Sequence, residues 1–521
     1  MSKIMAYHTI AYFAVFLPIV ILLYQVFPKK IRFAVILAAD IVFFWLFSGK
    51  LIIYLVCASL ITYFIGLWLE KIALNPGGLS NKLVTKKKRR VLALGILLNL
   101  AVLVVLKYTN FFGQTLSDIL NIFKVDWTYK PIRFMIPIGL SFYTLEIISY
   151  LTDVYRGTQK AEHNFAKVAL YLSFFPQTME GPIARFHETA DALYSGESIK
   201  FDNLKFGYQR ILWGLFKKIV VADRIYPTIK YIFGNYANLD GSIALFGAIC
   251  YVTQLYMEFS GCMDIVIGSG QIFGITLPEN FRQPFLAKNA GDFWRRWHIT
   301  LGTFFKDYIF YPVSLAKPVK NFAKKVKKRC GRNVSKFVAP TAALFCVWLS
   351  NGLWHGANWT FIFYGMYYFV LIFIENILEE PLKKLTEKLH INMESIGFRI
   401  FRAIKLFIIV VTGELFFNAA SLKDGFKMFG RIFTDFHISK LTSSIFQLKM
   451  DRYDIPVVAV GIILVTIVGA LKEKNIEIRR KVSGWVIPAR WVFWYAAIML
   501  VIIFGAYGSG YTAVDLIYAG Y

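Results

Sequence analysis

Two histidines have sequence surroundings that suggest acid–base chemistry. His355 lies in the apolar run 345–359, and His298 follows a short run of tryptophans and arginines. Histidine ordinarily titrates at about pH 6.5, so it can take up and return a proton near neutrality. An imidazole within apolar sequence must find a hydrogen-bond partner or cost free energy, and we therefore treat both residues as candidates for catalysis.

His355 is the stronger candidate, because other polar side chains lie close to it in the sequence. Asn351 precedes it by four residues, which places both on one face if the helix continues, and Asn358 follows it. The neighbouring Gly352 and Gly356 predict a broken helix, which a membrane tolerates where it lines a cavity. We expect the imidazole to border a water-accessible passage that leads to the cytosol. The alternative is a histidine bonded to a neighbouring helix, contributing only packing specificity.

The surroundings of His298 have an alternative explanation without catalysis. Tryptophans at the headgroup level and arginines on lipid phosphates form an ordinary interfacial belt, which leaves only the histidine unexplained. Two acids flank the run, Asp292 and Asp307, and either could orient the imidazole or pair with an arginine. The residues that such a belt explains are Trp294, Arg295, Arg296 and Trp297.

Motifs of other chemistries are missing from the sequence. There is no Walker loop, no GxSxG motif and no run of metal ligands, and the five cysteines have neither ligand nor disulfide spacing. A reaction would therefore rest on histidine acting on an activated donor supplied from elsewhere, and we expect no metal.

The composition is that of a polytopic membrane protein. Of the 521 residues, 57% are hydrophobic and only 17% are charged, whereas soluble proteins average about 45–50% and about 25%. The formal net charge of +27 would suggest a nucleic-acid partner in a soluble protein. Here the basic residues collect in short connections between apolar segments, which is the positive-inside pattern, and we expect no nucleic acid.

The apolar segments predict about ten to twelve membrane-crossing helices, each of about 20 residues. The first, 7–27, lacks a cleavage site and leads straight to another apolar run, so we expect a retained helix. Three segments, 134–152, 165–178 and 296–315, are short or polar and are expected to be interfacial or re-entrant. The other candidates are 31–47, 51–69, 91–110, 205–222, 242–273, 337–354, 358–378, 399–420, 455–471 and 490–507.

Basic connections set the expected orientation. The loop 82–90 has six basic residues and the loop 317–336 has nine, and neither contains an acid. Both should therefore be cytoplasmic. That assignment puts the N-terminus outside the cytoplasm and makes 422–454 a polar external loop.

Several sequence blocks resemble the membrane-bound O-acyltransferases (MBOAT). The paired signature is DFWRRWH at 292–298 followed by LWHGANWTF at 353–361. Supporting blocks are IPIGLSFYT at 136–144, DVYRG at 153–157, EGPI at 180–183, LPENFRQPF at 277–285 and FKDYI at 305–309. Their order and spacing over most of the chain are most similar to the bacterial subgroup that takes part in alginate O-acetylation.

The resemblance implies an all-α membrane fold, with a ring of tilted helices and short re-entrant helices around a cytoplasmic funnel. The chain would form one transmembrane domain, 1–521. Its parts would be N-terminal helices at 1–130, the catalytic core at 131–380 and C-terminal helices at 381–521.

It also implies an O-acyltransferase, with His355 as the buried catalytic histidine and His298 as the second family histidine. The donor would be a cytoplasmic thioester, either acetyl-CoA or an acyl carrier protein. The acetyl group would cross the bacterial inner membrane to a cell-surface polysaccharide, usually through an extracytoplasmic SGNH-type transferase as partner. Residues expected to line the donor channel are Trp294, Arg295, Arg296, Asp307, Asn351, Trp354 and Asn358.

Three other functions stay open at this stage. D-alanylation of teichoic acid would use a carrier-protein thioester. A transporter for a lipid-linked glycan would use the histidines as a proton relay and leave thioesters intact, although transporters often show inverted repeats and none is apparent here. A scaffold for polysaccharide machinery would need neither histidine.

Overall fold

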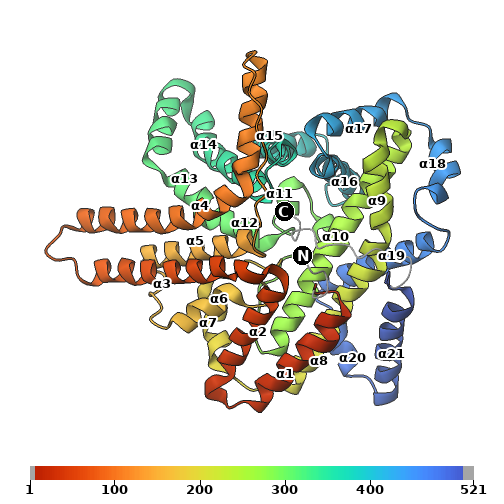
Figure 1. Ribbon diagram of the computed structural model, residues 1–521. Coiled ribbons are helices and arrows are strands. Elements are labelled where there is room, and N and C mark those ends of the chain that lie inside the picture. Colours follow the sequence, from red (N-terminus) through yellow and green to blue (C-terminus); the bar gives the residue numbers. More distant parts are fainter. Residues whose placement is uncertain (1–5, 508–521) are drawn as a thin grey trace. The chain divides into compact units, whose positions relative to one another are not determined.

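The computed structural model describes residues 6–507, and within that range the chain is helical, with one isolated antiparallel bridge between Phe281 and Trp297 (Figure 1). The all-α prediction is confirmed. Helices are continuous because the apolar segments lack interior breakers over most of their length, and a helix satisfies its own backbone hydrogen bonds in lipid.

Seven segments of the described range are long and apolar enough to cross a membrane: Lys29–Leu74, Asn81–Ile122, Gly241–Ile272, Lys317–His355, Trp359–Lys388, Asp454–Glu473 and Ile487–Phe504. A shorter apolar helix covers Ala11–Val26. The protein is therefore a multi-pass membrane protein. Its membrane, the side of its N-terminus and the predicted ten to twelve crossings stay predictions, because length and composition alone do not decide them.

The described residues group into two compact units. The first contains residues 6–211 and 262–278, and the second contains 212–261 and 279–507. The single domain expected from the sequence stays a prediction.

The first unit is dominated by a long helical hairpin of α3 (Ile52–Leu74) and α4 (Asn81–Ile122), which lie side by side in Figure 1. The turn between them has left-handed φ at Gly77 and Gly78, as the sequence Pro-Gly-Gly predicts. The prediction of a loop at 82–90 is wrong: these residues are the first turns of α4, since lysine and arginine are good helix formers. The other helices of this unit are α1 (Leu17–Val26), α2 (Arg32–Ser48), α5 (Leu140–Arg156), α6 (Phe165–Ser173), α7 (Phe186–Ser195), the first part of α8 (Phe201–Leu215) and the end of α10 (Gly241–Ile272).

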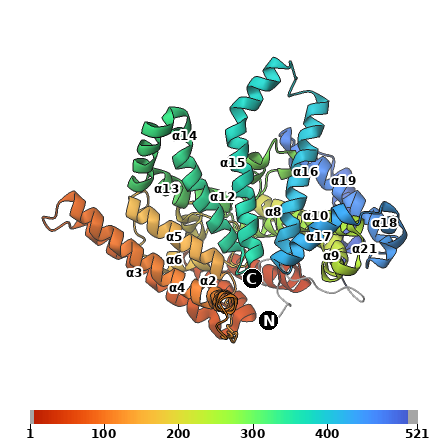
Figure 2. The same ribbon diagram turned by 90° about the horizontal axis from the view of Figure 1, so that it is seen from above.

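The second unit contains both candidate histidines. Within it α15 (Trp359–Lys388) and α16 (Ile396–Asn418) form a hairpin that is clear in Figure 2. The remaining helices are α9 (Asp223–Asn235), the start of α10, α11 (Ala290–Trp294), α12 (Ile299–Phe305), α13 (Tyr311–Leu315), α14 (Lys317–His355), α17 (Leu422–Thr434), α18 (Ile438–Ser444), α19 (Asp454–Glu473), α20 (Ile478–Ser483) and α21 (Ile487–Phe504), with π-helical turns at Phe216–Ala222 and Lys306–Phe310.

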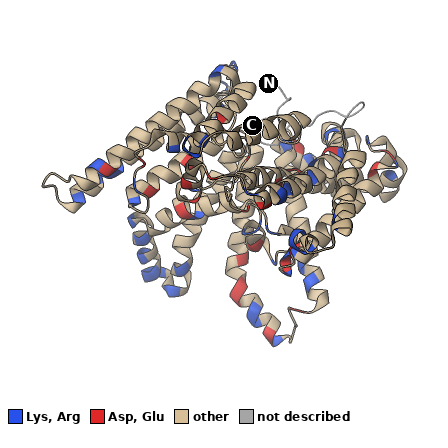
Figure 3. Cartoon of the chain, turned by 90° about the horizontal axis from the view of Figure 1, so that it is seen from below, with Lys and Arg blue, Asp and Glu red and all other residues tan. Residues whose placement is uncertain are grey.

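Two further segments expected as loops are helical. The basic stretch 317–336 is the first part of α14, and the chain reverses at Gly331, whose φ is +81°. Beyond the reversal, Ser335 Oγ donates to the carbonyl of Ala323 at 2.9 Å. The result is a pair of short antiparallel helical segments, and Figure 3 colours the positions of their Lys and Arg residues blue. The polar stretch 422–454 contains α17 and α18, because its apolar residues recur with helical spacing.

The end of α14, which carries His355, is held against α15 by close backbone contact. A Cβ on Gly352 would lie 2.5 Å from the carbonyl oxygen of Phe361, and one on Gly365 would collide with that of Trp348. Gly352 therefore permits helix packing and does not break the helix, which continues through His355. The predicted break is therefore wrong at Gly352 but confirmed at Gly356, where α14 ends and the backbone leaves the helix.

We predict that Gly365→Ala lowers the stability of the protein in detergent by about 1–3 kcal/mol, since the added methyl group forces two backbones apart. Gly430→Ala in α17 is the matched control, because nothing lies within 4 Å of its Cβ position. Thermal unfolding should show a lower midpoint for Gly365→Ala only. Equal midpoints for the two variants would contradict the close packing.

Candidate functional site

His355 ends α14 and lies in an aromatic enclosure. Its side chain is buried, and its ring makes edge contacts with Trp354, Phe417 and Tyr364 at centroid distances of 5.1, 5.1 and 6.1 Å. The predicted placement of Asn351 on the same helical face is confirmed by the continuous helix, and Asn351 is also buried. The passage to the cytosol stays a prediction.

One residue of this enclosure, Tyr364, is hydrogen-bonded to a buried carboxyl group. Tyr364 Oη donates to Glu414 Oε1 at 2.6 Å, which links α15 to α16. Glu414 is 2% exposed. The sequence signal was an acid within the apolar segment 399–420, but nothing in the sequence connected it to Tyr364 or to the histidine.

His298 has an unusual backbone for a residue other than glycine. It caps the N-terminus of α12 with φ +47° and ψ +52°, the left-handed region, which costs about 1–2 kcal/mol for most side chains. Such outliers persist only where the surrounding structure imposes them, and they cluster at functional sites. The histidine is therefore held in a fixed orientation by its own backbone.

Hydrogen bonding fixes the tautomer of a neutral His298. Its Nδ1 lies 3.2 Å from Asn280 Oδ1, and that same oxygen accepts from Thr300 N at 3.1 Å and Thr300 Oγ1 at 3.0 Å. A backbone N–H can only donate, so the shared atom is the amide oxygen and the His298 Nδ1 carries the proton. Nε2 then holds the lone pair, which suits it to accept a proton.

Trp354 brings the two histidines into one site. Its indole ring lies 5.6 Å from the His298 ring and 5.1 Å from the His355 ring, with edge-to-face geometry in both cases. The histidines are 57 residues apart in the sequence and belong to different helices. Both candidate histidines therefore contact the same indole ring.

Several buried polar atoms in this region have no hydrogen-bond partner within residues 6–507, and two of them belong to residues expected at the site. These two are the Trp294 Nε1 donor and the Asn351 Oδ1 acceptor. The Trp294 ring contacts Tyr364, which in turn contacts His355. A buried polar atom without a partner costs about 1–3 kcal/mol, so this donor and this acceptor are suited to a bound polar ligand.

The two arginines that precede His298 pair with acidic residues. Arg295 and Arg296 lie 3.5 and 3.3 Å from the Asp292 carboxylate, and Arg296 also pairs with Glu473 at 2.7 Å. Burial opposes ionisation of Asp292, but a backbone hydrogen bond from Lys288 and the two arginines lower its pKa below the usual value. Of the two alternatives, Asp292 therefore pairs with arginine.

Two expected channel residues are only half-buried. Asp307 is half-buried in the π-helical turn Lys306–Phe310. Asn358 caps α15 by accepting from Thr360 N at 3.1 Å and donates to the carbonyl of Ala420 at 3.4 Å. Capping accounts for an asparagine at this position without a ligand.

The tryptophans of the signature do not form a surface belt. Trp297 is buried and packs on Phe293, Phe281 and Tyr256 at 5.4, 5.1 and 6.0 Å. This aromatic cluster supports the turn that holds His298, so the belt explanation fails for Trp297.

A buried ion network begins beside His298. Phe259 contacts the imidazole edge-to-face at 4.9 Å. The preceding Glu258 pairs with Lys218 at 2.9 Å, and Lys218 also pairs with Asp223 at 2.8 Å. The burial of Lys218 could not be predicted, because a lysine near the end of an apolar segment is usually exposed. Asp264, another buried acid of α10, pairs with Arg210 in the first unit.

A second polar cluster ties α17 and α18 to the start of α10. His437 Nδ1 lies 2.8 Å from Asp240 and 3.6 Å from Asp435, which also pairs with Arg431. Burial opposes it, but hydrogen bonds from His437 and Ser242 lower the pKa of Asp240 well below its usual value. Two carboxylates and a histidine this close could hold a metal ion, a possibility that residues nearly 200 positions apart could not reveal in the sequence.

Comparison with known families decides the class of the protein. The profile of the MBOAT, membrane-bound O-acyltransferase family matches residues 158–420, about half of the chain, including both histidines. The chain belongs to this family. MBOAT membership makes the protein an O-acyltransferase and confirms the resemblance seen in its signature blocks.

Known members include close matches to this MBOAT chain. The probable alginate O-acetylase AlgI of Azotobacter vinelandii is 30% identical over 442 residues, covering 84% of this chain and 81% of the relative. The peptidoglycan O-acetyltransferase of Helicobacter pylori is 28% identical, covering 82% and 79%. The teichoic acid D-alanyltransferase of Bacillus subtilis is 27% identical, covering 53% and 70%.

We predict that Asn280→Leu lowers acyl transfer by about 10²-fold or more, because His298 loses the oxygen that fixes its tautomer. Asn280→Asp keeps an acceptor oxygen at that position and should recover part of the rate. Transfer rates of both variants, measured over a range of pH, test the assignment. Equal losses in the two would mean that the residue serves only folding.

Asn351→Leu should leave stability unchanged or raise it while reducing transfer, since an unsatisfied buried acceptor is replaced by an apolar group of similar size. Asn99→Leu is the control, because the buried Asn99 amide donates to the carbonyl of Gly95 at 2.9 Å. That variant should lose about 0.5–1.5 kcal/mol of stability and keep its activity. Unfolding midpoints and transfer rates distinguish the two patterns.

Proposed function

We propose that this chain takes an acetyl group from acetyl-CoA on the cytoplasmic side and passes it across the membrane for O-acetylation of a cell-surface polysaccharide. The observation behind the proposal is the pair of buried imidazoles joined by Trp354, with a buried donor and acceptor beside them. The names of the alginate and peptidoglycan relatives support the acetyl group and the glycan acceptor.

In the proposed reaction His355 is the general base. It takes the proton of the accepting hydroxyl as the oxygen attacks the thioester carbonyl carbon, so that a C–O bond forms and the C–S bond breaks. The proton then passes from the imidazolium to the departing thiolate, which leaves as the free thiol. His298 Nε2 positions the reacting group by hydrogen bonding, and the low polarity of the aromatic enclosure strengthens these polar interactions.

The donor side is assigned from charge. Arg295 is largely exposed, and the first half of α14 presents nine basic residues without an acid. Such a surface attracts an anionic CoA or carrier protein. We place it on the cytoplasmic side of the bacterial inner membrane, with the N-terminus outside and an SGNH-type transferase as the external partner.

D-alanyl transfer to teichoic acid from a carrier protein is the second candidate, because two relatives bear that name. We favour acetyl transfer because the acetylase relatives align over 84% of the chain and the D-alanyltransferases over 53% or less. Purified protein in proteoliposomes, given labelled acetyl-CoA or a labelled D-alanyl carrier protein, separates the two donors. Intact thioesters in both assays would favour the transporter.

We predict that His355→Ala abolishes release of thiol from acetyl-CoA, lowering the rate by about 10²–10⁴-fold. His187→Ala is the control, because His187 is exposed on α7. Both variants should insert and unfold like the parent protein. Undiminished transfer in folded His355→Ala would remove the general-base assignment and leave His298 as the alternative base.

A further inference from the structure

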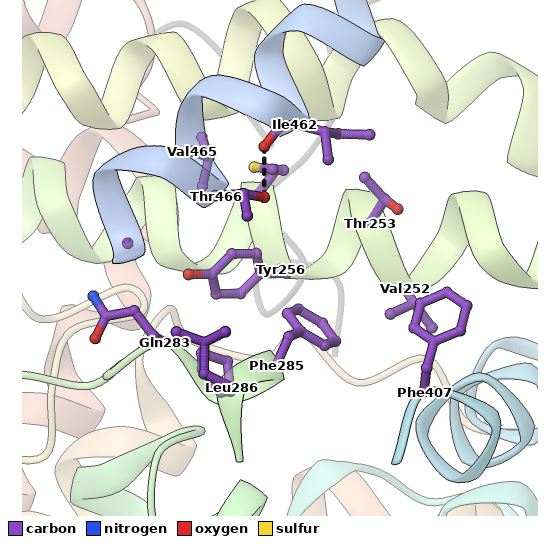
Figure 4. A pocket seen from close by; sticks show the side chains of 13 residues that line it. Val252, Thr253, Tyr256, Gln283, Phe285, Leu286, Phe407, Ile462, Val465 and Thr466 are labelled. Carbon is purple, nitrogen blue, oxygen red and sulfur yellow. Dashed lines mark hydrogen bonds between the residues drawn. The ribbon is translucent and has the colours of Figure 1, made fainter. Parts of the chain in front are cut away.

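An apolar groove in the second unit lies apart from the histidines. Its cavity of about 240 Å³ is lined by α10, the turn 283–286, α16 and α19. Figure 4 shows the side chains of Val252, Tyr256, Phe285, Phe407 and Val465 around it. All of these elements belong to the second unit, so the groove is a feature of that unit alone.

A second cavity extends the groove along α10. It measures about 220 Å³, shares Phe407 with the first and is lined by Leu245 and Ile249. Ile249, Val252 and Tyr256 lie four, seven and eleven positions after Leu245 on α10. The four residues therefore share one helical face. At 1.5 Å per residue the groove is about 16 Å long, close to the half-thickness of about 15 Å of a bilayer hydrocarbon core.

The walls are mostly apolar, and the hydroxyl of Thr253 donates to the carbonyl of Ile249 in its own helix at 3.0 Å. Thr466 could present a hydroxyl, but its Oγ1 donates to the carbonyl of Ile462 in its own helix at 2.8 Å, the dashed line in Figure 4. α10 and α19 are both long enough to cross the membrane. An apolar chain from the bilayer therefore matches the groove in chemistry and in length.

One end of the groove is basic. Gln283 and Gly469 line that end. Arg282 immediately precedes Gln283, and its side chain is 71% exposed. Glu473 lies one turn beyond Gly469, but it pairs closely with Arg296 at 2.7 Å and only loosely with Arg282 at 3.8 Å. Arg282 can thus reach an anionic headgroup, since arginine binds phosphate through several N–H groups.

We propose that this groove binds one acyl chain of an anionic glycerophospholipid whose phosphate contacts Arg282. The chain would lie along α10 from Tyr256 towards Leu245. Tyr256 also contacts Trp297, the residue before His298, so the bound lipid would pack against the aromatic cluster that supports the turn. The site does not depend on the identity of the acyl donor or acceptor.

Native mass spectrometry of the full chain in detergent, titrated with phosphatidylglycerol or phosphatidylcholine, tests the proposal. The parent should retain one phosphatidylglycerol at least tenfold more tightly than phosphatidylcholine. Arg282→Gln should remove the preference, and Thr466→Trp, which fills the groove, should weaken both lipids. The controls are Arg480→Gln, an exposed arginine of α20, and Ile463→Trp, on a part of α19 that does not line the groove.

A photoreactive phosphatidylglycerol locates the bound chain. Crosslinks within 245–256 or 462–469 that disappear in Thr466→Trp would support the assignment. Crosslinks elsewhere, equal retention of the two lipids, or equal effects in a variant and its control would overturn it. The unfolding midpoint shows whether a variant loses lipid only because it is unfolded. In that case the crosslinking pattern of the folded parent protein tests the proposal.

Discussion

The backbone contact between α14 and α15 is the constraint on which the site depends. Lipid gives apolar helices no hydrophobic reason to associate, so helices in a membrane are held by close packing and by hydrogen bonds. Gly352 and Gly365 allow two backbones to touch, and that contact fixes the end of α14 relative to the start of α15. His355 and Tyr364 face each other across the resulting turn, and Glu414 holds Tyr364 from α16.

The polar groups of the site follow two different rules. Most are satisfied within the protein, as Asn358 is by the start of α15 and Asp292 is by its arginines. Trp294 and Asn351 instead keep a buried donor and acceptor without a partner among the described residues. Interiors tolerate few such atoms, and their presence on the elements that carry the two histidines gives this region the character of a binding site as well as a packed core.

The features of the structure that depend on residues close in the sequence could be predicted from the sequence. The apolar segments predicted the helices, and the helical spacing of Asn351 and His355 predicted their shared face. Interactions between distant residues were not predictable: Asn280 with His298, Tyr364 with Glu414 and Lys218 with Glu258 each join separate elements. The basic segments were wrongly predicted to be loops. Positive charge indicates the side of the membrane on which a segment lies, but it does not indicate the backbone conformation, and lysine and arginine are good helix formers.

The shared contact with Trp354 makes the two imidazoles electrically dependent on each other. A positive charge on one ring opposes a positive charge on the other, because both are buried beside the same indole. The two rings therefore form one electrostatic unit, in which the charge of one affects the other. In the proposed reaction, the proton taken from the hydroxyl therefore leaves with the thiol before the next acceptor can react.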